Sequence, residues 1–149
     1  MAKVSLGSAG RRMTDPLVLI RLHRIELHVE PNEPESVWRL SAIEFGEGNV
    51  AVFGYILHSS EDGFGQAQVV LPVQHVKWSE AAKNKQSRAA FSDWVAKYAA
   101  EAMYDTARRA LQGQAAMMDA FFDIAIKAPE VKVDFVKAKK DEAAAKSAP

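Results

Sequence analysis

Four histidines have side chains that could bind a metal or transfer a proton: His23, His28, His58 and His75. His28 stands between Glu26 and Glu30, and imidazole with carboxylate is a common ligand set for transition metals. No compact ligand pattern such as H-E-x-x-H occurs, and His23 and His28 would face apart on a regular strand. A structural or surface role is therefore favoured, and we expect no metal site.

Residues 58–62, His-Ser-Ser-Glu-Asp, contain the residue types of a catalytic triad. Neighbours in sequence do not produce triad geometry, which needs three side chains to converge from different places. The glycines of 46–48 and 63–65 precede predicted strands rather than helices, so they do not resemble a phosphate-binding loop. We expect no catalytic residues, no cofactor and no enzymatic activity.

Methionines and phenylalanines near the end of the chain are the strongest functional candidates. Methionine repacks easily around different partners, so such a cluster can line a groove for apolar peptide. The alternative is core packing, which the helical periodicity favours, and the two roles can share residues. Adjacent phenylalanines cannot both point into one core, and an aromatic at a turn tip is hard to bury. The expected peptide contacts are Phe64, Met117, Met118, Phe121 and Phe122.

Composition indicates which classes of partner to expect. The chain has 149 residues, 19 Lys plus Arg, 19 Asp plus Glu and no cysteine. This length is typical of a single domain, and the balanced charge gives no basic field to attract nucleic acid. The N-terminus lacks the apolar core of a signal peptide, and the longest apolar run, 17–20, is too short to span a bilayer. We expect no membrane insertion and a cytoplasmic location.

Alternating apolar residues predict four strands, at about residues 17–30, 36–45, 50–59 and 66–78. Glycine-containing turns at 46–49 and 61–65 join the last three. The apolar parity of the first strand changes near His23-Arg24, which predicts a bulge there. Pro72 predicts an edge position or another bulge, because proline cannot donate to a ladder.

Residues 87–111 predict a long helix with an apolar stripe that includes Phe91, Trp94, Val95, Tyr98 and Met103. Gly113 interrupts the pattern, a second helix is predicted at about 114–127, and Pro129 ends it. Residues 131–135 alternate and predict a short extended segment. The predicted fold is therefore α+β, a four-stranded antiparallel β-meander packed against a long helix and a second helix. It occupies residues 16–136, between a flexible arm (1–15) and a disordered or weakly helical tail (137–149).

The third and fourth predicted strands are apolar on both faces. One layer of helices covers only one face of a sheet, and soluble monomers rarely leave a large apolar patch exposed. We therefore expect another surface to cover the second face: a subunit, a client, or the C-terminal segment. A homo-oligomer that stacks sheets is the simplest of these.

The order of elements and several local stretches resemble the SecB family of protein-export chaperones. Residues 21–34 (RLHRIELHVEPNEP) are similar to the family's first strand and its "SFE-PN-P" ending. Residues 62–78 resemble its third and fourth strand region. Residues 98–109 are similar to the helix that carries a "PYAR" pattern, with Ala107-Arg108 retained. Residues 128–135 (APEVKVDF) are similar to its "PPVNF" stretch.

This resemblance, over about residues 20–136, implies a dimer of dimers, an apolar groove for unfolded polypeptide clients, and no cofactor. The expected function is an ATP-independent holdase. Two other classes stay open: an oligomeric assembly or scaffold protein of phage or virion type, and a small α+β domain that encloses a ligand pocket. Holdase activity would separate the chaperone from the assembly protein, and a bound small molecule or metal would favour the third class.

Overall fold

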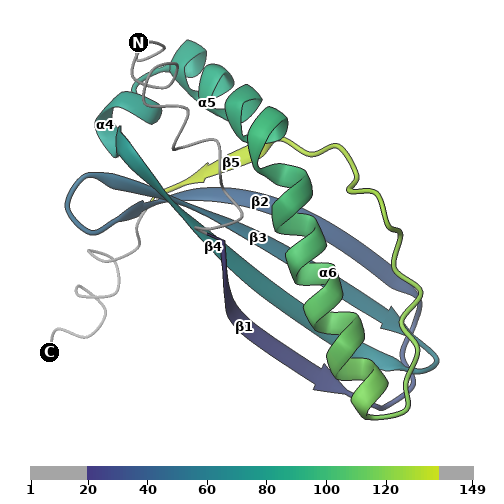
Figure 1. Cartoon of the computed structure of the whole chain (residues 1–149). Helices are drawn as coiled ribbons and strands as arrows, with labels where there is room; N and C mark the ends of the chain where they lie inside the picture. The colour runs from purple at the N-terminus through teal and green to yellow at the C-terminus, as the bar shows by residue number, and fades with distance from the viewer. Residues whose placement is uncertain (1–19, 138–149) are drawn as a thin grey trace, which may run out of the picture.

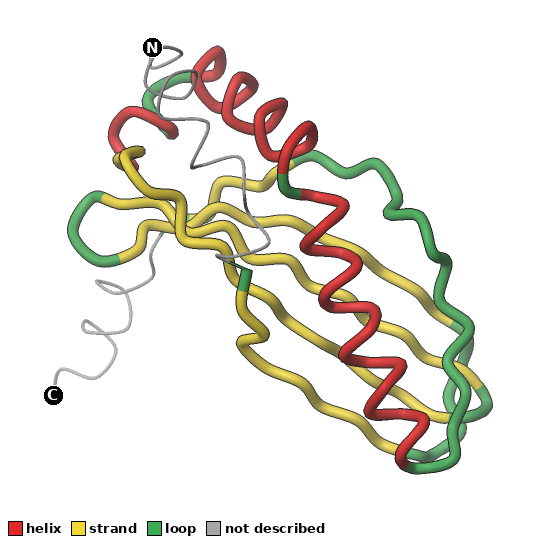
Figure 2. Tube along the Cα trace, viewed as in Figure 1, coloured by secondary structure: helices red, strands yellow, loops and turns green. Residues whose placement is uncertain are grey.

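The computed structural model describes residues 20–137 and shows one sheet with helices on one of its faces (Figures 1 and 2). The strands are β1 (Arg21–His28), β2 (Glu35–Phe45), β3 (Asn49–Ser60), β4 (Gly63–Lys77) and β5 (Val133–Val136). The helices are α4 (Trp78–Ala81), α5 (Lys85–Tyr98) and α6 (Ala100–Met117). The α+β class is confirmed. The predicted count of four strands was wrong, because the short extended segment joins the sheet as β5. The predicted arm, and the predicted tail beyond Lys137, lie outside the described residues.

The strand order is β1-β4-β3-β2-β5, so the predicted meander is correct only for β2, β3 and β4. β1 pairs antiparallel with β4 instead of β2, and β5 lies parallel to β2. The chain between β1 and β2 therefore crosses the end of the sheet, where the Asn32 N–H donates to the Ser60 carbonyl at 2.9 Å. Local alternation and turn residues cannot reveal this pairing, because it joins segments about forty residues apart.

The bulge predicted in β1 is present, as a register shift between Leu22 and Arg24. It changes where the histidines point. The His23 ring packs against Phe53 at a centroid distance of 5.5 Å, and the His28 ring against Phe64 at 6.0 Å. Phe53 and Phe64 both lie on the face away from the helices, called the open face below. The expectation that the two histidines face apart was wrong, because it assumed a regular strand.

Pro72 sits near the end of β4, where the pairing with β1 has already stopped at Val70. One side of β4 has no paired described strand at this point, so the missing N–H of proline leaves no gap in the ladder. Pro72 is therefore at an edge of the sheet, as predicted, although most of β4 lies between two other strands.

The long helix divides into α5 and α6 at Ala99, which has φ −129° and ψ −33°. A stripe of buried residues nevertheless continues across this break at four-residue intervals: Val95, Ala99, Met103, Ala107, Leu111 and Ala115. The alanines in this stripe let the helix approach the sheet closely. The predicted stripe was partly wrong, since Trp94 is half-buried and Tyr98 is 39% exposed.

The helix-covered face of the sheet forms the core, and glycine makes room in it for a large ring. A Cβ on Gly54 would lie 2.6 Å from Cη2 of Trp38, so this position on β3 must stay without a side chain. Trp38 then packs edge-on against Tyr104 of α6, with centroids 5.1 Å apart. This contact joins the first half of β2 to the first half of α6.

The second helix predicted at 114–127 is absent from the structure. α6 continues past Gly113 to Met117, and residues 120–132 contain neither helix nor strand, with a bend at 126–127. The helix ends because Asp119 takes a left-handed conformation with φ 59°. Its N–H and that of Ala120 donate to the carbonyls of Ala116 and Ala115, the pattern of a Schellman motif.

The open face combines apolar and polar side chains. Phe53, Leu57 and Val70 are half-buried there. Beside them, Tyr55 donates to Gln66, and Gln66 donates to Glu26. Hydrogen bonds from His28 and from Gln66 hold the pKa of Glu26 below its ordinary value. Polar ladders of this kind are compatible with water, so only part of this face needs a covering surface.

Candidate functional site

Residues 118–132, called the strap, leave α6 by a turn at 118–119 and then run back alongside the helix, with a bend at 126–127 (Figure 1). Side chains point alternately inward and outward over the first part of the strap. Phe122 and Ile124 are buried at 1% and 6% exposure, whereas Phe121 and Asp123 are exposed. This two-residue period in the sequence predicts an extended segment. The prediction of a helix over these residues did not take it into account.

Two side chains of α6 hold the main chain of the strap. The Tyr104 hydroxyl donates to the Ala125 carbonyl at 2.6 Å, and the Gln112 amide donates to the Phe122 carbonyl at 2.8 Å. Burial raises the pKa of Tyr104, so the hydroxyl stays protonated and able to donate. Arg108 donates to Gln112 at 2.9 Å and pairs with Asp105, which orients Gln112 for its bond to the strap.

The Phe122 ring enters a socket in the core. Its wall is the imidazole of His58, with ring centroids 4.9 Å apart. Its floor is Gly65, where an added Cβ would lie 2.7 Å from both Phe122 Cε2 and Leu111 Cδ1. The structure therefore contradicts the expectation that Phe122 contacts clients from the surface. Of the adjacent phenylalanines, Phe122 anchors the strap and Phe121 faces outward.

His58 itself is 6% exposed. Its Nδ1 lies 3.0 Å from the Ser36 hydroxyl, and its Nε2 is buried without a hydrogen-bond partner among the described residues. Burial lowers the pKa of His58, and the nearby Asp123 carboxylate opposes this only in part. The residue is therefore a neutral packing group beneath the strap.

The triad residue types of 58–62 each have a different partner. The Ser59 hydroxyl donates to the Glu33 carbonyl, and an Asp62 carboxylate oxygen accepts the Phe121 N–H at 3.3 Å. His58 contacts Ser36. These three side chains therefore do not converge. Within residues 20–137, no group of three or more His, Asp or Glu side chains is arranged to hold a metal ion.

Four exposed apolar side chains lie on the strap and at the adjoining end of α6. Met117, Phe121 and Ile126 are 79%, 70% and 78% exposed, and Met118 is 44% exposed. We call these four residues the apolar rim. The structure thus brings three predicted residues, Met117, Met118 and Phe121, onto one segment. Ile126 was missed, and it breaks the alternation of the strap: its spacing from Phe122 and Ile124 would turn it inward, but it is exposed.

Phe64 lies elsewhere. It is half-buried on the open face, against His28, whereas its neighbour Gly65 faces the helices. The strap and Phe64 are therefore on opposite sides of the sheet, although both are near the β3–β4 turn. The structure does not bring Phe64 into the apolar rim.

No protein-family profile, curated protein or solved structure matches this chain. None of the helices within residues 20–137 is both long enough and apolar enough to cross a membrane.

Proposed function

We propose that the protein is an ATP-independent holdase-type chaperone, similar to the SecB export chaperones, acting in the cytoplasm. It binds extended apolar segments of unfolded polypeptides at the apolar rim. The observation that supports this most strongly is the exposure of Met117, Phe121 and Ile126, each at least 70% accessible on a chain that buries its core side chains well. Exposed apolar side chains that follow one another closely along a surface segment often mark an interaction site.

The chemistry of the rim suits many sequences. Methionine side chains are flexible and polarizable, so they adapt to different apolar partners, and phenylalanine adds a large contact area. The rim is also anchored: Phe122 and Ile124 fix the strap from below while Phe121 and Ile126 stay free above. Binding then requires no rearrangement of the core. Such binding is passive, and its affinity is set by apolar area removed from water.

Suppression of aggregation tests this function. A slowly refolding client is diluted from denaturant without ATP, and light scattering is followed with wild-type protein, Phe121→Asp and Phe45→Asp. Phe45 is 49% exposed at the end of β2, beside the β2–β3 turn, so it offers the same substitution outside the rim. Wild type and Phe45→Asp should protect, and Phe121→Asp should lose most of the protection. Absence of protection by folded wild type at several-fold molar excess would reject the function.

The second candidate is an oligomeric assembly or scaffold protein without chaperone activity. It rests on the half-buried apolar side chains of the open face, Phe53, Leu57 and Val70, which a second sheet could cover. We propose a dimer or tetramer under either function. Light scattering at micromolar concentration measures the mass, and a monomer would contradict this part of the proposal. An oligomer that gives no client protection would favour the assembly function.

A further inference from the structure

Two adjoining cavities lie between α5 and the chain that leads from the strap into β5. One has a volume of about 470 Å³ and is lined by helix residues 92–101 and by residues 127–132. The other, of about 310 Å³, lies between the first half of α5 and residues 132–135. Ser92 and Lys132 line both, so the two cavities adjoin, and together they are called the α5 groove below.

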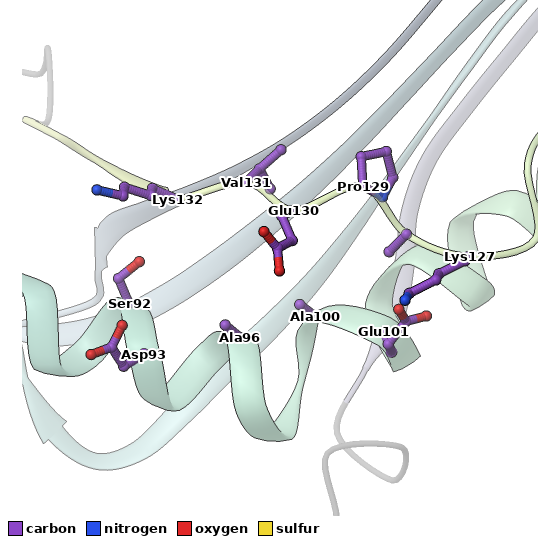
Figure 3. A pocket seen from close by; sticks show the side chains of 11 residues that line it. Ser92, Asp93, Ala96, Ala100, Glu101, Lys127, Pro129, Glu130, Val131 and Lys132 are labelled. Atoms are coloured by element: carbon purple, nitrogen blue, oxygen red, sulfur yellow. The ribbon is translucent and has the colours of Figure 1, made fainter.

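Several of the side chains that line the α5 groove are small. Ala96 and Ala100 point from the helices toward the opposite wall, and Pro129 and Val131 belong to that wall (Figure 3). Ser92 joins the two walls, because its Oγ accepts the Val133 N–H at 3.1 Å. Small residues leave space beside the helix that larger ones would fill.

The wall formed by the strap has free main-chain groups. Residues 126–131 make no hydrogen bond to other described residues, and after a bend at 126–127 they belong to neither a helix nor a strand. Extended backbone with unpaired N–H and C=O groups can accept a further strand by hydrogen bonding. The proline at 129 removes only one of the donors.

Charge is divided between the two ends of the groove. Lys85, Arg88 and Lys132 line the end next to the start of α5, together with a single carboxylate, Asp134. Three carboxylates, Asp93, Glu101 and Glu130, line the other end, together with Lys127 and the shared Lys132. Figure 3 shows Glu130 pointing from the strap toward the helices. Among the described residues, none of these side chains forms an ion pair within 4.0 Å.

We propose that the α5 groove is a docking site for an extended peptide of a partner protein, acidic at one end and basic at the other. Arg88 and Glu101 are separated by about 20 Å along the helices at about 1.5 Å per residue. An extended peptide covers that distance in about six residues. The occupant therefore carries its acidic and basic residues about six positions apart, with small residues between them.

This site is separate from the proposed chaperone function. The α5 groove recognises a fixed charge pattern, whereas the apolar rim binds apolar segments of any sequence. The groove lies along α5 and the second half of the strap, and the rim centres on the end of α6 and the first half of the strap. A partner docked in the groove leaves Met117 and Phe121 accessible.

Binding of a labelled peptide tests the proposal. The probe is an end-blocked peptide with two aspartates, four small apolar residues and two lysines, followed by fluorescence anisotropy with the full-length protein. The control has the same composition with the charges interleaved. We expect the first peptide to bind at least tenfold more tightly, with the difference shrinking at high salt because the charges are exposed.

A charge-reversed variant supplies the matched test. In Lys85→Glu/Lys132→Glu the basic end becomes acidic, and a glutamate at the start of α5 also suits the helix dipole, so the fold should persist. This variant should lose at least tenfold in affinity for the probe and should gain affinity for a peptide with lysines at both ends. Phe121→Asp should bind the probe as wild type does.

Equal binding of the ordered and interleaved peptides would overturn the proposal, as would the absence of binding to either. A change of solution mass in Lys85→Glu/Lys132→Glu would also overturn it, because the groove would then be a contact between copies of this chain. None of these results depends on whether the protein protects clients from aggregation.

Discussion

The ring of Phe122 occupies the space that a side chain on Gly65 would need: a Cβ there would lie 2.7 Å from Cε2 of the ring. One strand residue without a side chain thus allows one aromatic side chain to fix the strap. The exposed neighbours of Phe122 depend on this contact for their position. The contact between Phe122 and Gly65 therefore supports both the fold and the proposed client-binding surface.

Gly65→Ala should destabilise the protein by about 1–3 kcal/mol, since an added methyl group overpacks the socket. Backbone strain does not contribute, because Gly65 has no left-handed φ. The matched control is Gly113→Ala in α6, where no atom lies within 4 Å of an added Cβ. That change should stabilise by about 0.5–1 kcal/mol through helix propensity. Urea midpoints measure both, and equal shifts would contradict the socket.

Phe122→Ala and Phe121→Ala should differ sharply in stability. Loss of a fully buried phenylalanine costs about 3–5 kcal/mol, and loss of a 70% exposed one should stay within about 0.5 kcal/mol. Chemical denaturation of the two variants side by side gives the comparison. Similar costs would mean that the strap does not distinguish the adjacent phenylalanines as described.

Trp94→Ala should cost less than Phe91→Ala. Trp94 is half-buried and packs between Phe91 and Tyr98, with centroids 6.0 Å from each, whereas Phe91 is 6% exposed. We expect about 1–2 kcal/mol for Trp94→Ala, from lost aromatic contacts and partial burial, and about 3–5 kcal/mol for Phe91→Ala. The opposite order in thermal or urea unfolding would show that α5 is rotated relative to this structure.

Stability should fall as the pH drops from 7 to 5 because of His58. Burial lowers its pKa in the folded state, whereas the unfolded chain has the ordinary value of about 6.5. Below that value the unfolded chain binds a proton that the folded chain does not, so acid favours unfolding. The contribution is complete above pH 6.5 and declines toward the folded pKa.

His58→Asn removes this titration while keeping a polar group for Ser36. Its denaturation midpoint should therefore depend less on pH between 7 and 5 than that of wild type. Identical slopes for the two proteins would assign the effect to other groups.

Much of the sheet followed from local sequence. The strands and their hairpins were predictable because alternation and glycine turns act over a few residues, and the parity change located the bulge near His23. The pairing of β1 with β4 was not, because the contacts that decide it are distant in the sequence. The end of α6 was also missed, since Asp119 adopts a conformation that more often belongs to glycine.

The candidate site was predictable in composition but not in arrangement. Met117, Met118 and Phe121 were expected to face outward as part of a helix, and they are exposed on a helix end and an extended strap. Phe122 was assigned to the same surface because sequence alone does not show which of two adjacent phenylalanines meets the empty space above Gly65. That information lies in β4, nearly sixty residues earlier.

Equilibrium binding of a permanently unfolded polypeptide tests the central claim most directly. The labelled client is titrated, without nucleotide, with wild type, with Met117→Ser/Phe121→Ser, and with Phe45→Ser as the control outside the rim. We expect wild type and Phe45→Ser to bind alike and the double rim variant to bind at least tenfold more weakly while its unfolding midpoint is unchanged. Undiminished binding by the stable double variant would contradict the assignment of the apolar rim as the client site.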